Sequence, residues 1–237
     1  MNLEKIAQAL DIDCEYDLEI TGLNTLLDSN KNELTLLENK KYINDLAKTK
    51  AGAVLVKKEF LKKVPQDTIA LVCEEPYVAL AKASKYFAPK VVETIGNDAI
   101  VGENTKVLDN VYIGKNTKIG NDCTIMPGVF IGDNVKIGNN TILYPNVCIY
   151  RDCAIGNDCI IHAGTIIGSD GFGFAQQIWS DYIKIYQNGN VIIKNNVDIG
   201  SNCAIDRAAF KSTIIEDNVR LDNLVHIAHN CVLERWM

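Results

Sequence analysis

The chain has 237 residues, a formal net charge of −6 and an isoelectric point near 5.1, so we expect neither nucleic acid nor an anionic membrane as its main partner. No apolar run approaches the roughly 18–20 residues that cross a bilayer, and the N-terminus lacks the apolar region of a signal peptide. These features predict a cytoplasmic protein with no integral membrane segment, in which the eight cysteines stay reduced.

The first part of the chain, residues 1–90, mixes helical and strand patterns, which predicts a small α/β domain. A helix is expected over residues 2–10, because Leu3, Ile6 and Leu10 share one face. A second helix is expected over Tyr77–Phe87, opening at Pro76. The remaining expected elements are the helix Lys41–Lys48 and the strands Glu19–Leu23, Glu33–Leu37, Ala53–Val56 and Ile69–Cys73. Pro89 marks the join to the next domain.

The second part, residues 91–237, is built from hexapeptides. An aliphatic residue recurs every six positions from Ile95 to Ile167 without a miss. Three residues after it stands Asn, Asp or Gly in every repeat through that of Ile161, and these residues tolerate positive φ best. Each hexapeptide therefore predicts a short strand plus a corner, and three of them close one triangular coil of a parallel β-helix.

The position four residues after each inward aliphatic residue is compact. It holds Thr or Val in most repeats, and it also holds Cys123, Cys153, Cys159, Cys203 and Cys231. The spacing of Cys153 and Cys159 could also indicate metal ligands, but the shared register favours small residues that fill a corner, with no metal.

Gly follows the inward aliphatic residue in eight of the thirteen repeats from Ile95 to Ile167. Among the exceptions, four larger residues stand eighteen positions apart, one per coil: Leu108, Met126, Tyr144 and His162. Such a stripe of large outward side chains predicts a face that is buried against another subunit, and we expect a homotrimer.

The hexapeptide rhythm breaks after Ile167, and residues 168–192 are expected to project from the coil as a loop. The segment contains many aromatic residues, so we expect it to be ordered, and Phe172 and Phe174 are candidates for substrate contact. The rhythm resumes at Ile193, slips at DRAAFKST and returns from Ile215 to Leu233.

Chemistry is expected from residues that depart from the repeat. Among the three histidines, His162 falls in the outward stripe and fits an interface. His229 falls at a corner, and an imidazole that titrates near neutral pH suits a general base for acyl transfer to an amine. Asp222, Asn223 and Asn230 lie near it in sequence and could orient the ring or bind substrate, although Asn230 also fits a purely structural corner. His226 is a further candidate for substrate binding. The HxxH spacing also allows zinc, but no third ligand is close in the sequence.

The strings IHAGTIIGSDGFGFA, CAIDRA, LDNLVHIAHNC and KTKAGAVLV resemble those of the UDP-3-O-(3-hydroxyacyl)glucosamine N-acyltransferases of lipid A biosynthesis, over nearly the whole chain. The resemblance implies a left-handed β-helix, a homotrimer, and His229 as the general base, with no cofactor. It implies an (R)-3-hydroxyacyl donor on acyl carrier protein and UDP-3-O-acylglucosamine as acceptor.

The resemblance also implies a uracil site at the segment LLENKKY. Asn39 and Tyr42 match the family pattern F-x-x-N-P-K-Y, whereas Leu36 and Lys40 replace its Phe and Pro. Tyr42 would stack on the base and Asn39 would bind its polar edge.

The end of the sequence, CVLERWM, departs from the family, which continues through further coils to a helical C-terminus. We therefore expect a truncated chain that lacks coils helping to form the acyl groove. Two alternative functions stay open. One is another sugar-nucleotide acetyl- or acyltransferase, and the other is a catalytically impaired β-helix that binds a UDP-sugar.

Overall fold

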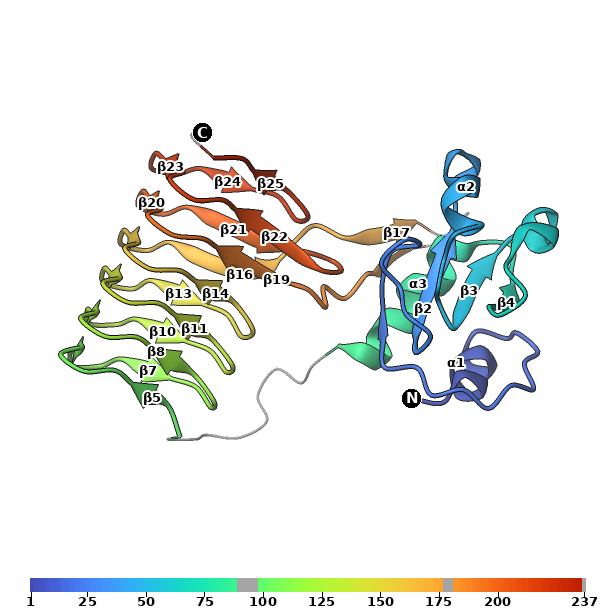
Figure 1. Cartoon of the computed structure of the whole chain (residues 1–237), viewed down its shortest axis with the longest axis horizontal. Coiled ribbons are helices and arrows are strands. Elements are labelled where there is room, and N and C mark those ends of the chain that lie inside the picture. The colour runs from blue at the N-terminus through green and yellow to red at the C-terminus, as the bar shows by residue number, and fades with distance from the viewer. Residues whose placement is uncertain (89–97, 177–180, 236–237) are drawn as a thin grey trace. The chain divides into compact units, whose positions relative to one another are not determined.

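The computed structural model describes residues 1–88, 98–176 and 181–235, and the chain divides into two compact units (Figure 1). The N-terminal unit comprises Met1–Pro89 and Gly173–Asn188, and the solenoid unit comprises Lys90–Phe172 and Gly189–Met237. The expectations at Pro89 and Ile95, and residues 177–180 of the expected loop, lie outside the described residues.

The N-terminal unit is built on a sheet of four parallel strands in the order β1-β2-β3-β4. The strands are β1 (Gly22–Leu23), β2 (Glu33–Leu37), β3 (Ala53–Val56) and β4 (Ile69–Val72). The helices are α1 (Leu3–Ala9), α2 (Ile43–Leu46) and α3 (Pro76–Ser84), with short 3-10 helices η1 (Lys40–Tyr42), η2 (Lys58–Lys63) and η3 (Lys85–Phe87). All four residues of β3 are buried, and α3 packs against β2 and β3.

Two expected elements of this unit are shorter than their sequence patterns. The strand expected at Glu19–Leu23 is reduced to the two residues of β1. The helix expected at Lys41–Lys48 begins as η1, because the Asn39 side chain accepts a hydrogen bond from the N–H of Lys41 at 2.9 Å and tightens the first turn. The Pro76 start of the third helix is as expected.

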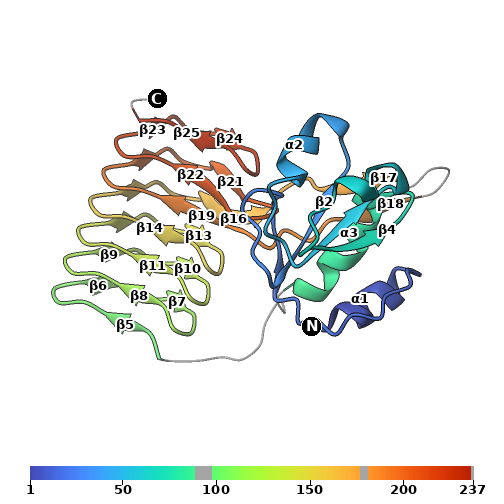
Figure 2. The same cartoon turned by 45° about the vertical axis from the view of Figure 1, so that its right-hand side comes forward.

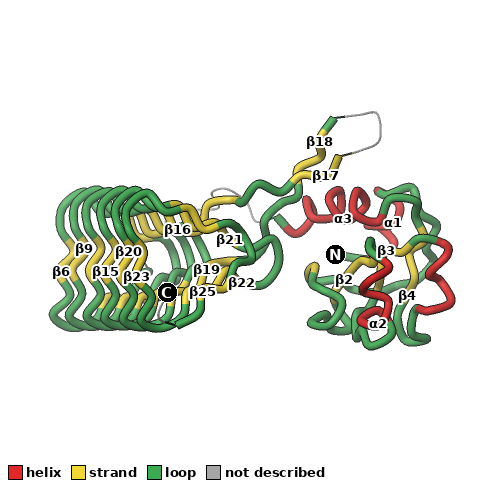
Figure 3. The backbone as a smooth tube through the Cα atoms, turned by 90° about the horizontal axis from the view of Figure 1, so that it is seen from above, coloured by secondary structure: helices red, strands yellow, loops and turns green. Residues whose placement is uncertain are grey.

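Residues Gly173–Asn188 form a hairpin of the N-terminal unit, where the sequence favoured a loop projecting from the coil. Its antiparallel strands are β17 (Phe174–Gln176) and β18 (Tyr182–Lys184). The hairpin packs on α3 (Figure 3). Ala175 and Ile185 are buried in a cluster with residues of α3, and the Tyr186 N–H donates to Ser84 Oγ at 3.0 Å. Apolar side chains that alternate along the hairpin explain why it packs on a helix.

The solenoid unit has three parallel sheets, drawn as stacked coils in Figures 1 and 2. Face 1 comprises β5 (Ile100–Val101), β8 (Lys118–Ile119), β11 (Lys136–Ile137), β14 (Ala154–Ile155), β19 (Asn190–Ile193), β22 (Ser212–Ile215) and β25 (Val232–Leu233). Face 2 comprises β6 (Lys106–Val107), β9 (Thr124–Ile125), β12 (Ile142–Leu143), β15 (Ile160–Ile161), β20 (Asp198–Ile199) and β23 (Arg220–Leu221). Face 3 comprises β7 (Tyr112–Ile113), β10 (Phe130–Ile131), β13 (Cys148–Ile149), β16 (Ile166–Asp170), β21 (Ala204–Arg207) and β24 (His226–Ile227).

The hexapeptide pattern of inward aliphatic residues and corners with positive φ is confirmed in this unit. The recurring aliphatic residues of the middle coils, such as Ile131 and Ile149, are fully buried inside. The Asn, Asp and Gly residues predicted at corners have positive φ, for example +55° at Asn140 and +76° at Gly128. One residue earlier, a corner side chain links successive coils, as where Asn121 Oδ1 accepts the Glu103 N–H at 2.8 Å.

The corner cysteines fill the interior as expected. Cys123, Cys153, Cys159 and Cys203 are buried, Cys231 is partly buried, and all are free thiols. Burial raises the pKa of the Cys153 and Cys159 thiols. The Cys159 thiol donates to the Lys194 carbonyl at 3.1 Å, so the slot also uses the weak donor of this side chain.

Candidate active site

His229 stands at the corner that follows β24, and its ring is oriented by Asn230. The His229 Nδ1 atom lies 2.9 Å from Asn230 Oδ1. The amide orientation of Asn230 is fixed independently, because its Oδ1 accepts the Ala209 N–H at 3.0 Å and its Nδ2 donates to the Phe210 carbonyl at 2.9 Å. Asn230 Oδ1 is thus an acceptor, so His229 Nδ1 must donate. The neutral imidazole therefore carries its free lone pair on Nε2, as a general base requires.

Asn230 combines this role with the corner geometry of the repeat. Its φ is +62°, and its N–H donates to Thr213 Oγ1 at 2.9 Å. Ala209 and Phe210 belong to the segment DRAAFKST, where the sequence rhythm slips. The slip leaves backbone groups free to hold the Asn230 amide, so an irregular coil supports the histidine.

Gly171 lies directly against the His229 ring. A Cβ atom added at Gly171 would stand 2.8 Å from both Cβ and Cδ2 of His229. Only glycine lets the main chain pass so close to the imidazole, which is half-buried here. The glycine of the GSDG segment therefore fixes one side of the ring by contact.

His226 is held by a different group on face 3. Its Nε2 atom lies 3.0 Å from Asp206 Oδ2, and Ser169 Oγ donates to Asp206 Oδ1 at 2.9 Å. Gly168, with a φ of +89°, forms a bulge that shifts the register so that Ser169 pairs with Asp206. The bulge thus builds a polar chain that ends on an exposed imidazole.

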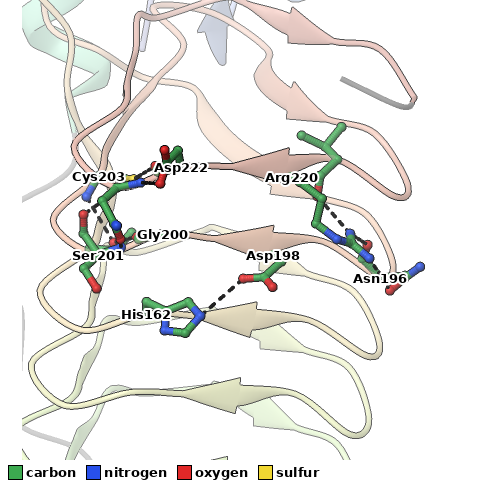
Figure 4. Close-up of polar contacts among 11 residues, drawn as sticks. His162, Asn196, Asp198, Gly200, Ser201, Cys203, Arg220 and Asp222 are labelled. Atoms are coloured by element: carbon green, nitrogen blue, oxygen red, sulfur yellow. Dashed lines mark hydrogen bonds and ion pairs between the residues drawn. The ribbon is translucent and has the colours of Figure 1, made fainter.

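A groove of about 540 Å³ lies on face 2, and Figure 4 labels several of the residues that line it, among them His162, Asp198 and Arg220. Its lining residues are His162, Asp198, Gly200, Arg220, Leu221, Asp222 and Asn223. His162 Nε2 lies 3.4 Å from Asp198 Oδ1, and the His162 ring stacks on Tyr144 with centroids 4.8 Å apart. The predicted stripe of large side chains therefore ends at His162, which borders this polar groove.

Asp222 and Asn223 stand at the corner between face 2 and face 3. Asp222 Oδ1 accepts the Asn223 N–H at 2.7 Å, and Asn223 Oδ1 accepts the Ser201 N–H at 2.7 Å. Their side chains thus serve the corner as well as the groove. His226 and His229 follow along the same coil, on face 3 and at the next corner, so the structure assembles the predicted residues as two neighbouring groups.

Asn39 and Tyr42 of the N-terminal unit lie just beyond the end of β2. The Asn39 side-chain oxygen caps η1, which leaves its amide nitrogen for other partners. Tyr42 is 45% exposed, and the Lys41 ammonium lies 4.9 Å from its ring centroid. Leu36 is half-buried in β2.

Three further polar residues near Asn39 and Tyr42 were not predicted from the sequence as site residues. Glu38, Lys57 and Cys73 directly follow β2, β3 and β4, so they share the carboxyl edge of the parallel sheet, where ligands of such sheets bind. Lys57 Nζ lies 3.8 Å from Glu38 Oε1. Burial, with Glu38 and Glu74 adding to it, raises the pKa of the Cys73 thiol to about 11. Each of these residues directly follows a predicted strand, and that position alone could have indicated a shared site at the edge of the sheet.

The two candidate phenylalanines belong to different units. Phe172 is 86% exposed and ends a segment of the solenoid unit. Phe174 opens β17 in the N-terminal unit and meets the edge of Tyr182 at a centroid distance of 6.3 Å.

Residues 17–86 match the family model for UDP-3-O-(3-hydroxymyristoyl) glucosamine N-acyltransferase. A relative from Sulfurimonas denitrificans, the UDP-3-O-acylglucosamine N-acyltransferase 1, is 54% identical over 98% of this chain and 74% of its own length. The chain belongs to this N-acyltransferase family. The enzyme of the same name from Campylobacter jejuni is 51% identical over 98% of this chain and 73% of its own. That of Helicobacter pylori is 42% identical over 98% and 70%.

The resemblance seen in the sequence is thereby confirmed. Residues 116–151 and 134–169 match the six-repeat hexapeptide model of bacterial transferases, and the solenoid unit is the left-handed parallel β-helix of that class. The chain spans about three quarters of the length of these N-acyltransferase relatives. In the part of the chain that the structure describes, no helix is long and apolar enough to cross a membrane.

Proposed function

We propose that the chain moves a (R)-3-hydroxyacyl group from acyl carrier protein to the 2-amino group of UDP-3-O-acylglucosamine, a step of lipid A biosynthesis. The relatives carry the name of this acceptor. The observation that carries the proposal is the arrangement of His229, whose Nδ1 donates to Asn230 and whose Nε2 lone pair is left for a proton.

In the proposed reaction the sugar nitrogen attacks the thioester carbon and a C–N bond forms. His229 Nε2 takes a proton from that nitrogen as the C–S bond breaks. The protonated imidazole then returns this proton to the departing thiolate, so the products are an amide and a thiol. Asn230 stabilises the imidazolium, because its Oδ1 accepts from Nδ1 throughout.

Substrate binding is proposed for the remaining predicted residues. Tyr42 offers a ring face to the uracil and Asn39 its amide nitrogen. Asp222, Asn223 and His226 would contact the sugar from the coil of His229. The exposed rings of Phe172 and Phe174 are proposed to contact the acyl chains.

We also propose a homotrimer whose interface includes Met126, Tyr144 and His162, which share face 2. In this arrangement His229 faces a neighbouring subunit. Light scattering should give three times the mass of one chain, and a monomer would contradict the interface.

Transfer is tested with the purified chain, UDP-3-O-acylglucosamine and 3-hydroxyacyl carrier protein, with mass spectrometry of the product. A product whose mass increases by one hydroxyacyl group supports the proposal. Product only from acetyl coenzyme A would favour another sugar-nucleotide acetyltransferase. Binding of UDP-N-acetylglucosamine with no product from either donor would favour a β-helix that only binds.

A further inference from the structure

Asp206 is a carboxylate that the proposed base catalysis does not use. It lies in β21 on face 3 and is only 7% exposed. Its described hydrogen bonds are to Ser169 and His226. The neighbouring Arg207 directs its guanidinium elsewhere, to the carbonyls of Gly168 and Arg151, both at 2.8 Å. The negative charge of Asp206 is therefore directed at His226.

The partner of His226 fixes which nitrogen of its ring is free. A carboxylate oxygen only accepts, so Nε2 of His226 donates to Asp206, and the neutral ring carries its lone pair on Nδ1. Within the described part of the chain, Nδ1 has no hydrogen-bond partner, and the side chain is 63% exposed. Face 3 thus presents an acceptor nitrogen on a ring whose orientation a buried carboxylate fixes.

This acceptor lies beside the candidate base. His226 and His229 are three positions apart in one coil. Ser169 contacts Asp206, and Gly171, two residues later, lies against the His229 ring. The segment from Ser169 to Gly171 therefore contacts the carboxylate that holds His226 and the ring of His229 itself.

We propose that Asp206 and His226 form the subsite that binds the amino group of the acceptor in its ammonium form. This inference rests on the proposed function, because it assumes an amino sugar as acceptor. An ammonium N–H that donates to His226 Nδ1 makes a charge-assisted hydrogen bond, which is stronger than the bond from a hydroxyl. His226 is then a positioning residue that brings the nitrogen to His229. Before attack the ammonium releases one proton to solvent, and His229 takes the second proton as the C–N bond forms. The Asp206–His226 pair thereby selects an amino sugar over a hydroxyl sugar.

The inference is tested by calorimetric titration with UDP-glucosamine and UDP-glucose, at a pH where the amine is protonated. The two probes differ only in the group at C2, so uracil contacts cancel in the ratio of their dissociation constants. We expect the wild-type chain to bind UDP-glucosamine about tenfold more tightly. Asp206→Asn keeps an acceptor for His226 but removes the charge, and it should bring the ratio to within about twofold of one.

Asp133→Asn is the matched control. It makes the same charge change after β10, four strands from β24 in the sheet of face 3 and so about 19 Å away. Asp133 Oδ1 accepts the Lys115 N–H at 2.8 Å, a role that Asn121 fills in another coil. This variant should keep the wild-type ratio.

A second variant guards against misfolding of Asp206→Asn. His226→Leu changes an exposed side chain and should also bring the ratio near one, because the amino and the hydroxyl probe lose the same acceptor nitrogen. A wild-type ratio near one, or a ratio that neither variant lowers, would overturn the inference. Acyl transfer by the wild-type chain together with such a ratio would keep the proposed function and remove the ammonium subsite alone. If both variants lower the ratio but the wild-type chain transfers no acyl group, the ammonium subsite stands and the proposed function is removed.

Discussion

The lower coils, from Val101 to Ile161, and the upper coils, from Ile167 to Leu233, share one hexapeptide repeat. They differ in what their polar side chains hold. In the lower coils, polar corner side chains bond to the next coil, as Asn139 Oδ1 does with the Asn121 N–H at 2.8 Å. In the upper coils, Asn223 keeps this role toward the Ser201 N–H, but Asn230 and Asp206 also bond to the rings of His229 and His226. Regularity therefore stabilises the solenoid, and departures from it hold the candidate chemistry.

The departures carry backbone strain that the lower corners avoid. Leu224 and Lys211 have φ values of +61° and +65°, in a region that costs such residues about 1–2 kcal/mol each. The lower corners place Asn, Asp or Gly at positive φ. Four predictions test this difference between the lower and the upper coils.

The largest effect is expected from His229→Ala. Removing a general base should lower kcat by about 10²–10⁴-fold, while binding of the UDP-sugar stays nearly intact. Tyr42→Ala should do the opposite and chiefly weaken binding. Steady-state kinetics in a chain extended to the length of its relatives separates kcat from KM. Near-normal kcat in His229→Ala would show that the upper coils hold the base elsewhere, with His226 the next candidate.

Two glycine substitutions test the comparison itself. In the lower coils, a Cβ at Gly120 would stand 2.7 Å from the Gly138 backbone carbon, so Gly120→Ala should lower the free energy of unfolding by roughly 1–3 kcal/mol. In the upper coils, Gly171→Ala would displace the His229 ring and should lower kcat about tenfold, a change of about 1.4 kcal/mol in the barrier. Urea unfolding and kinetics on both variants check this. If both variants lost the same free energy of unfolding and kept the wild-type kcat, the lower and upper coils would not differ as we propose.

A smaller effect is expected from Cys159→Val in the interior of the lower coils. The slot holds Val or Thr in other repeats and requires small volume, although the thiol donates to the Lys194 carbonyl. The free energy of unfolding should change by less than about 1.5 kcal/mol. A larger loss, or zinc that is bound in proportion to the chain and lost on substitution, would contradict a purely structural corner cysteine.

The smallest effect is a gain. Leu224 occupies a corner slot with positive φ and is 77% exposed, so Leu224→Asn should raise the free energy of unfolding by roughly 0.5–1 kcal/mol. The midpoint of urea unfolding measures it, with Asn146→Leu in a lower coil as the reverse substitution. If Leu224→Asn destabilises the chain, the Leu224 side chain has a role that its exposure does not reveal.

The solenoid could be predicted from the amino-acid sequence alone. A six-residue period and a left-handed corner at Asn, Asp or Gly are local properties, because each coil contacts only its neighbours and repeats one geometry. The inward aliphatic residues, the cysteine slot and the stripe of face 2 all follow from that register. The candidate base was found for the same reason, since His229 is conspicuous where the repeat leaves a corner exposed.

The groups around that histidine depend on contacts between distant segments. Asp206, Ser169 and Gly171 lie far from His229 in the chain, and a bulge at Gly168 brings Ser169 to Asp206. The hairpin Phe174–Lys184 read as a loop because its apolar residues face α3, about a hundred positions earlier in the sequence. Such pairings depend on packing between distant segments, and a local periodicity carries no signal of a contact that one irregular residue creates.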